Sequence, residues 1–90
     1  MSQVSVRLFG GAAAAFGAQE VEAGPVDDLA GMVEWLSREG AERSGSPDPE
    51  RLREVLDQCS FFVDGEHYRS LGTSLPDGCR VDVLPPFAGG

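Results

Sequence analysis

The chain has 90 residues, and its 15 acidic side chains outnumber seven arginines, with no lysine, to give a net charge of −8. A chain of this length forms a single domain with a small core, and the hydrophobic fraction of 41% is typical of a folded globule. The negative charge argues against nucleic acid and anionic membrane surfaces as partners and favours basic protein surfaces.

Neither a secretory signal nor a membrane span is expected. The first residues contain no basic segment followed by an apolar one, and the longest apolar run, Ala12–Phe16, is far too short to cross a bilayer. We therefore expect a cytoplasmic protein. Cys59 and Cys79 cannot hold a structural zinc ion or an iron–sulfur cluster without help from His67, the sole histidine, and no bound metal or cofactor is predicted. Both thiols are expected to behave as small hydrophobic residues.

The N-terminal part of the chain predicts a β-hairpin. Val4–Phe9 alternates apolar and polar side chains, which is typical of a half-buried strand, and Gly10 and Gly11 end it. Ala12–Gly17 is expected to be a loop or a single helical turn. Gln19–Ala23 predicts a second strand, which pairs with the first.

A helix is expected next, with Gly24 as its cap, Pro25 at its first position and Gly40 at its end. Four apolar residues recur at helical spacing and form one stripe that faces the core: Leu29, Met32, Val33 and Leu36. Trp35 lies about 100° from this stripe and is expected at the edge of the core.

The rest of the chain predicts a loop over residues 41–50, a short helix and three strands. The helix, residues 50–58, directs three residues inward: Leu52, Val55 and Leu56. The strands are expected at residues 59–63, 66–69 and 80–84. A turn at Asp64-Gly65 joins the first two of them, and a proline- and glycine-containing turn over Leu75–Gly78 precedes the last.

This order of elements predicts an α+β fold of the β-grasp type. The sheet is mixed and has about five strands, with one main helix on one face and a short second helix. The first and last strands lie side by side and parallel at its centre. We expect residues 1–84 to form this domain and residues 85–90 to form a C-terminal tail.

The tail is the most informative segment of the sequence. Pro85 and Pro86 cannot continue a sheet, because each lacks a backbone N–H group, and Gly89 and Gly90 have no Cβ. A chain end this slender fits a channel that is too narrow for a side chain. We therefore predict that the terminal carboxylate of Gly90 is the reactive group and that it is presented to the active site of another protein.

The faces of the strands predict where partners bind. Three large apolar residues alternate with core residues and therefore point away from the helix: Phe9, Phe62 and Leu84. They should form one patch at the base of the tail, and such a contiguous apolar patch indicates a surface that binds partner proteins. Four tail residues are also predicted to contact the partners: Pro85, Pro86, Phe87 and Ala88.

Three segments of the chain are similar to those of one protein family: Val6–Phe9, Phe62–Gly65 and Leu75–Gly90. They resemble the ubiquitin-like sulfur carriers of bacteria, above all the small subunit of molybdopterin synthase. The resemblance covers essentially the whole chain. One departure is Pro25, which stands where the family often has a threonine at the start of the helix.

The resemblance implies a sulfur carrier that is not itself an enzyme and binds no cofactor of its own. An E1-like enzyme would adenylate Gly90 with ATP, and sulfur from the persulfide of a sulfurtransferase or desulfurase would replace AMP to leave a thiocarboxylate. The carrier would then donate this sulfur to an acceptor enzyme, such as the large subunit of molybdopterin synthase. The two terminal glycines leave room for this chemistry.

Two other functions remain open. The same adenylated tail could be transferred to a lysine of a substrate protein, as in a protein modifier, or the domain could be an interaction module that is never activated. The acceptor pathway of a carrier is open as well, because molybdopterin synthesis, cysteine formation and secondary metabolism all use carriers of this type.

Overall fold

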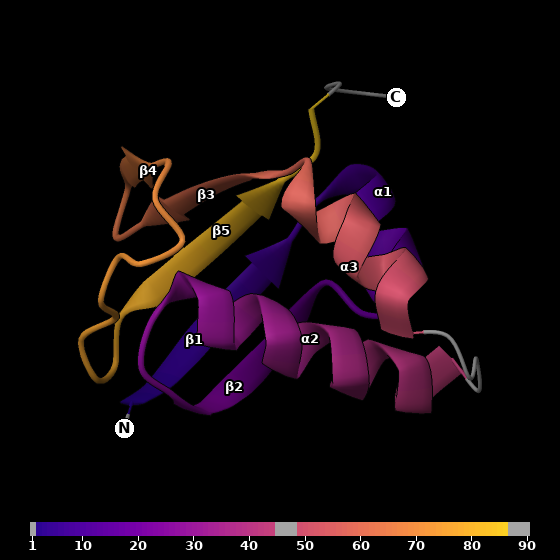
Figure 1. Cartoon of the computed structure of the whole chain (residues 1–90), viewed down its shortest axis with the longest axis horizontal. Helices are drawn as coiled ribbons and strands as arrows, with labels where there is room; N and C mark the ends of the chain where they lie inside the picture. The colour runs from indigo at the N-terminus through magenta and orange to yellow at the C-terminus, as the bar shows by residue number, and fades with distance from the viewer. Residues whose placement is uncertain (1, 45–48, 87–90) are drawn as a thin grey trace.

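The structure is a computed structural model and describes residues 2–44 and 49–86 (Figure 1). Its elements follow one another as β1 (Ser2–Leu8), α1 (Gly10–Phe16), β2 (Glu20–Val26), α2 (Leu29–Ser44), α3 (Pro49–Asp57), β3 (Ser60–Val63), β4 (Glu66–Tyr68) and β5 (Arg80–Leu84). The five strands form one sheet in the order β2-β1-β5-β3-β4. All the predicted strands are therefore confirmed.

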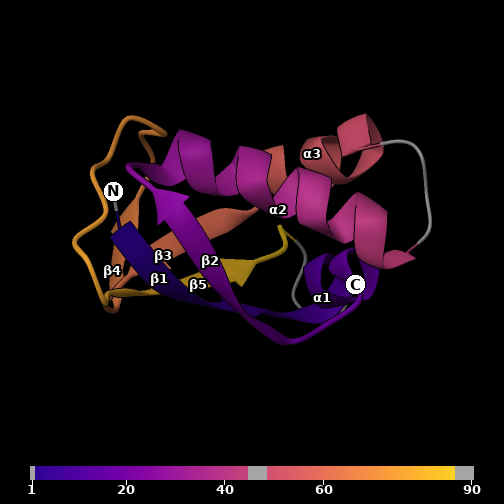
Figure 2. The same ribbon diagram turned by 90° about the horizontal axis from the view of Figure 1, so that it is seen from below.

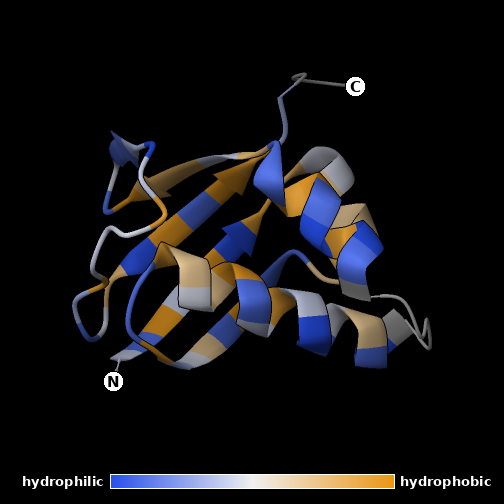
Figure 3. Ribbon diagram, viewed as in Figure 1, coloured by the Kyte–Doolittle hydropathy of each residue, from blue (hydrophilic) through white to orange (hydrophobic). Residues whose placement is uncertain are grey.

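The centre of the sheet is the parallel pair of β1 and β5, as predicted. Val6 lies opposite Val81, and Leu8 lies opposite Val83. The other neighbours, β1 with β2, β5 with β3 and β3 with β4, are antiparallel. Apolar and polar residues alternate along β5, which Figure 3 shows as alternating orange and blue. This alternation gives the central strands one apolar face.

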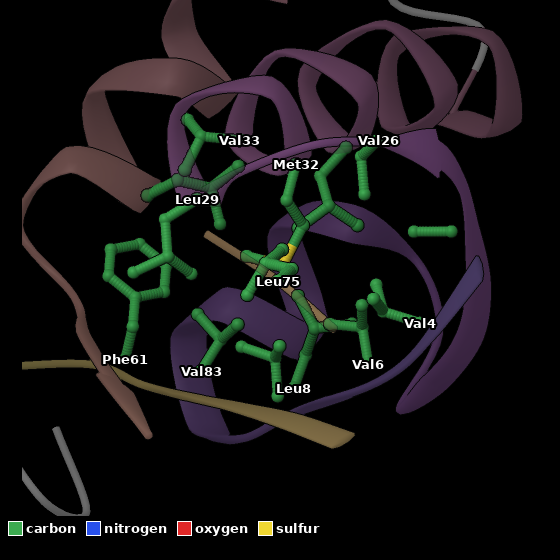
Figure 4. Packing of buried hydrophobic residues seen from close by; sticks show 14 of the residues in the cluster. Val4, Val6, Leu8, Val26, Leu29, Met32, Val33, Phe61, Leu75 and Val83 are labelled. Atoms are coloured by element: carbon green, nitrogen blue, oxygen red, sulfur yellow. The ribbon is translucent and has the colours of Figure 1, made fainter. Parts of the chain in front are cut away.

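The core lies between that apolar face and the helices. α2 and α3 cover one side of the sheet, and no helix of the described chain lies on the other side (Figure 2). Figure 4 shows the helix residues Leu29 and Met32 packed toward strand residues such as Leu8 and Val83. The predicted helical stripe is fully confirmed, because all four of its members are at most 2% exposed. Trp35 is half-buried, as expected for the edge of the core.

The predicted start of α2 is wrong. Gly24 and Pro25 belong to β2 and are joined by a cis peptide bond. β2 is an edge strand, where a residue without an N–H group is tolerated. The helix begins at Leu29 because Asp28 caps it: the Asp28 Oδ1 accepts a hydrogen bond of 2.8 Å from the Gly31 N–H.

The predicted end of α2 is also wrong. The helix continues through Gly40 to Ser44, so the predicted loop starts later, and residues 45–48 within it lie outside the described residues. Gly40 is buried where α2 meets α1 and α3. A Cβ at this position would overlap Leu52 Cδ2 of α3 and would lie 3.0 Å from Phe16 Cδ1 of α1. Gly40 therefore serves helix packing rather than helix termination.

α1 is a longer helix than expected. It spans Gly10–Phe16, about two turns, where a loop or a single turn was predicted. It ends at Gly17, whose φ is 97° and whose N–H donates a hydrogen bond of 2.8 Å to Ala13 O. Ala12 and Phe16 are fully buried in the common core. The helix is therefore an integral part of the domain.

α3 confirms the predicted short second helix. Leu52 and Leu56 are buried and Val55 is half-buried, so all three point inward to some degree. None of the helices within residues 2–44 and 49–86 is long and apolar enough to cross a membrane.

Candidate functional site

The tail begins at the end of the central strand. β5 ends at Leu84, which lies opposite Ser60 of β3. Pro85 beyond it is half-buried and Pro86 is exposed, and Figure 1 shows the chain leaving the sheet at this point, beside α3 and α1. The remaining predicted site residues lie outside the described residues and stay predictions: Phe87, Ala88, Gly89 and Gly90.

The three residues of the apolar patch (Phe9, Phe62 and Leu84) lie on the sheet face that points away from the helices, as predicted. The side chain of Phe9 is 40% exposed and that of Leu84 is 36% exposed. The parallel register of β1 and β5 makes these two residues neighbours at the strand ends. Phe62 is less exposed than these two residues: it is half-buried, and its ring stacks on that of His67 with 4.9 Å between the ring centroids. The role of this patch in docking stays a prediction.

An ion pair lies in the middle of this face. Asp82 lies opposite Phe62 in β3 and opposite Arg7 in β1. Its Oδ1 accepts a hydrogen bond of 3.0 Å from Arg7 Nε, and this hydrogen bond, with the carboxylate charge, raises the pKa of Arg7. The guanidinium carbon of Arg7 lies 5.6 Å from the centroid of the Phe9 ring, within cation–π range. This face of the sheet is thus apolar at the end nearest the tail, at Phe9 and Leu84, and carries the ion pair beside Phe62.

The sequence interpretation missed this ion pair, although a signal for it was present. Arg7 and Asp82 each lie two residues before a member of the patch, Phe9 and Leu84, so the same alternation directs both charges to the open face of adjacent central strands. Opposite charges on one face of neighbouring strands favour a cross-strand pair. The exact register of the two strands was needed to place the two groups opposite each other.

Neither cysteine is set up as a nucleophile. Cys79 is buried, and the half-buried Cys59 donates a hydrogen bond of 3.2 Å from its Sγ to Val55 O. Burial raises the pKa of both thiols, which keeps them protonated at neutral pH. Both are free thiols, as expected for small hydrophobic residues. His67 is exposed, and no group of three metal-ligating side chains is found in the part of the chain that the structure describes.

Solved structures with the same fold come from several microorganisms. A molybdopterin converting factor subunit 1 of Pyrococcus furiosus is 20% identical, with a TM-score of 0.75, over 97% of this chain and 100% of that chain. The small archaeal modifier protein 1 of Methanosarcina acetivorans is 20% identical, with a TM-score of 0.73, over 100% of this chain and 98% of that one. At this identity the likeness shows the fold, which is the predicted β-grasp.

A third similar structure is a complex of subunits 1 and 2 of the molybdopterin-converting factor from Helicobacter pylori. Its matched chain is 26% identical, with a TM-score of 0.63, over 98% of this chain and 99% of that chain. No curated protein matches the sequence. The model of the ThiS family matches residues 6–90, nearly the full length. The chain therefore belongs to the ThiS family of ubiquitin-like sulfur carriers.

Proposed function

We propose that this protein carries sulfur as a thiocarboxylate on Gly90, for the synthesis of a molybdopterin-type cofactor or another metabolite. The observation that carries the proposal is the root of the tail, by which we mean Leu84–Pro86, where the chain leaves the sheet. The central strand β5 ends at Leu84, and two prolines then direct the chain out of the sheet. The family model extends over the glycines at the end of this tail.

The chemistry that we propose needs an unhindered carboxylate. An oxygen of the Gly90 carboxylate attacks the α-phosphorus of ATP in the E1-like partner, and pyrophosphate leaves. The terminal sulfur of a donor persulfide then attacks the acyl carbon, and AMP leaves. A thiol cleaves the resulting acyl disulfide, forms a disulfide with the donor cysteine, and releases the thiocarboxylate. Gly89 and Gly90 place no side chain near any of these attacks. The carrier is a cosubstrate in this scheme, and the activating partner binds the ATP.

We propose the apolar patch as the docking surface for these partners. Phe9 and Leu84 are the most exposed of its members and lie beside the root of the tail. A partner that covers them would therefore also hold the tail. The Helicobacter pylori complex supports a large subunit of a molybdopterin-converting factor as the acceptor partner.

A protein modifier is the second candidate function. The similarity to small archaeal modifier proteins supports it. Both functions begin with the same adenylation of Gly90 and differ only in the nucleophile that follows, which is a sulfur donor in one case and a lysine amine in the other.

Intact-mass measurement tests the proposal and separates the alternatives. The native protein should first be shown to end at Gly90. It is then incubated with an E1-like enzyme, ATP, a persulfide donor and a thiol that can cleave the acyl disulfide, with an otherwise identical mixture without ATP as control. A carrier gains the mass difference between sulfur and oxygen, a modifier forms a conjugate with a second protein, and an interaction module keeps its mass.

Two tail variants complete the experiment. Deletion of Gly90 or Gly89→Leu should abolish the mass change, whereas the thermal unfolding midpoint should stay within about 2 °C, because surface changes away from the core alter stability little. Normal adenylation of the truncated protein would refute the proposal.

A further inference from the structure

The root of the tail rests on a glycine of α1. Gly10, the first residue of that helix, has a φ of 53°, and a Cβ built on it would lie 3.1 Å from Pro85 Cγ. At such a distance the proline ring would have to move by a few tenths of an ångström to make room for a methyl group. The ring of Pro85 therefore packs directly over the bare Cα of Gly10.

This contact is held in place by backbone hydrogen bonds. The Phe9 N–H donates a hydrogen bond of 3.1 Å to Val83 O of β5, and the Ala12 N–H donates one of 3.1 Å to Phe9 O. The first bond ties the residue before α1 to the end of β5, two residues before Pro85. Gly10 and Pro85 are thus fixed relative to each other by the sheet and by the helix start.

The other side of the root faces α3. Pro86 borders a surface hollow of about 480 Å³ together with Val55 and Gln58 of that helix. Figure 1 shows the chain rising between the end of α3 and α1. The two prolines therefore leave the sheet through a seat that α1 forms on one side and α3 on the other.

We propose that Gly10 is a positioning residue, which seats the Pro85 ring and so sets the direction in which the carboxylate of Gly90 is presented. This inference rests on the proposed function, because direction matters only for a chain end that must enter a partner's active site. Four residues beyond Pro86 span at most about 14 Å. A change in the direction of the chain at Pro85 therefore displaces the carboxylate of Gly90.

The size of the effect follows from the displacement. A misplacement of about 1 Å can cost about 100-fold in rate. If the logarithm of the rate falls linearly with the displacement, a shift of a few tenths of an ångström should cost about three- to ten-fold. The loss should appear in kcat for adenylation, with the KM for the carrier nearly unchanged, because the apolar patch that docks the partner is not altered.

Gly17 provides the matched control. It lies at the other end of α1 with a φ of 97°, and a Cβ on it would meet nothing within 4 Å. Gly17→Ala therefore introduces backbone strain of the same kind as Gly10→Ala without touching the tail. We expect both variants to lower the unfolding midpoint, but only Gly10→Ala to lower kcat.

A double-mutant cycle with Pro85→Ala completes the test. Pro85→Ala alone should lower kcat, and Gly10→Ala should add no further loss in that background, because the ring with which the new methyl overlaps is gone. Additive losses, or an equal loss of kcat in Gly17→Ala, would overturn the inference and leave Gly10 with a purely structural role.

A second readout keeps the inference testable if the wild-type chain is never adenylated. Nuclear Overhauser contacts between Gly10 Hα and the Pro85 ring should be present in the free protein. The amide resonances of Ala88 and Gly89 should shift in Gly10→Ala and stay unchanged in Gly17→Ala. Absence of these contacts, or equal shifts in both variants, would refute the packing of Pro85 on Gly10. This result does not depend on whether the protein carries sulfur.

Discussion

Substitution of Gly40 by alanine tests how the three helices pack. In an open helix the change would favour folding by about 1 kcal/mol, because alanine has the higher helix propensity. In this structure the new methyl group would overlap Leu52 Cδ2 and lie 3.0 Å from Phe16 Cδ1. Both side chains are nearly or fully buried, at 6% and 0% exposure, so neither can swing into solvent without losing core contacts.

The expected result is a net loss of stability. Overpacking of a core costs about 1–3 kcal/mol, and two buried neighbours place Gly40→Ala at the upper end of this range. After the gain in helix propensity, the free energy of unfolding should fall by about 2 kcal/mol. For a domain of this size the unfolding midpoint should then fall by about 8–16 °C.

Gly31→Ala in the same helix is the control. Its new methyl group would lie 3.3 Å from Asp28 Oδ1 and 3.9 Å from Val26 Cβ, and the partly exposed carboxylate of Asp28 can move by the small amount required. Because the same oxygen caps the helix through the Gly31 N–H, the gain in helix propensity is set against a small loss at the cap, and the stability of this variant should stay within about 1 kcal/mol of the wild type.

Urea unfolding followed by circular dichroism and by Trp35 fluorescence measures both variants. Leu52→Ala should cost about 2–5 kcal/mol alone, but the double variant Gly40→Ala/Leu52→Ala should lose less than the sum of the two, because the new methyl fills the space that Leu52 vacates. A Gly40→Ala protein that is more stable than the wild type would refute the packing argument. It would mean that no close contact requires glycine at this position.

The remaining predictions concern the patch and the thiols. Phe9→Asp and Leu84→Asp should each raise the Kd for the E1-like enzyme about tenfold or more in calorimetric titration, because an apolar anchor is lost at the docking surface; unchanged affinity in both would place that surface elsewhere. Cys59→Ala and Cys79→Ala should retain sulfur loading, and its loss in a folded Cys59→Ala protein would indicate a persulfide relay. Burial raises the pKa of both thiols, so above about pH 8.5 the unfolded chain loses these protons before the folded one does, and stability should fall as the pH rises. From about pH 8 to about pH 10 the urea midpoint of the wild type should decrease by more than that of the double alanine variant. An equal or smaller decrease would contradict this.

The faces of the strands could be predicted from the sequence alone. Alternation with a period of two in β1 and β5 determines which residues face the helix, and Val6, Val81 and Val83 are all buried accordingly. The same reasoning placed Phe9 and Leu84 on the open face. These assignments hold because strand geometry leaves each side chain only two directions, so a local pattern is sufficient.

The apolar stripe of α2 was equally predictable, since its spacing repeats over two turns, but the ends of the helix were not. Gly24-Pro25 has the composition of a helix start, and Gly40 has that of a helix end. Pro25 is instead accommodated because β2 lies at the edge of the sheet, and Gly40 because two other helices approach it. Both facts depend on neighbours that are distant in the sequence.

Three features of the site were decided only by the tertiary structure: α1, the Arg7–Asp82 pair and the contact between Gly10 and Pro85. α1 consists of glycine, alanine and a single phenylalanine, so it has no contrast between apolar and polar positions from which a helix could be predicted. The pairing of Arg7 with Asp82 and the contact between Gly10 and Pro85 each join residues about 75 positions apart. The sequence predicts that a tail leaves the sheet after the last strand, because a proline lacks the backbone N–H group that a sheet ladder needs. The surroundings of its root depend on the parallel pairing of the first strand with the last, which only the folded chain brings about.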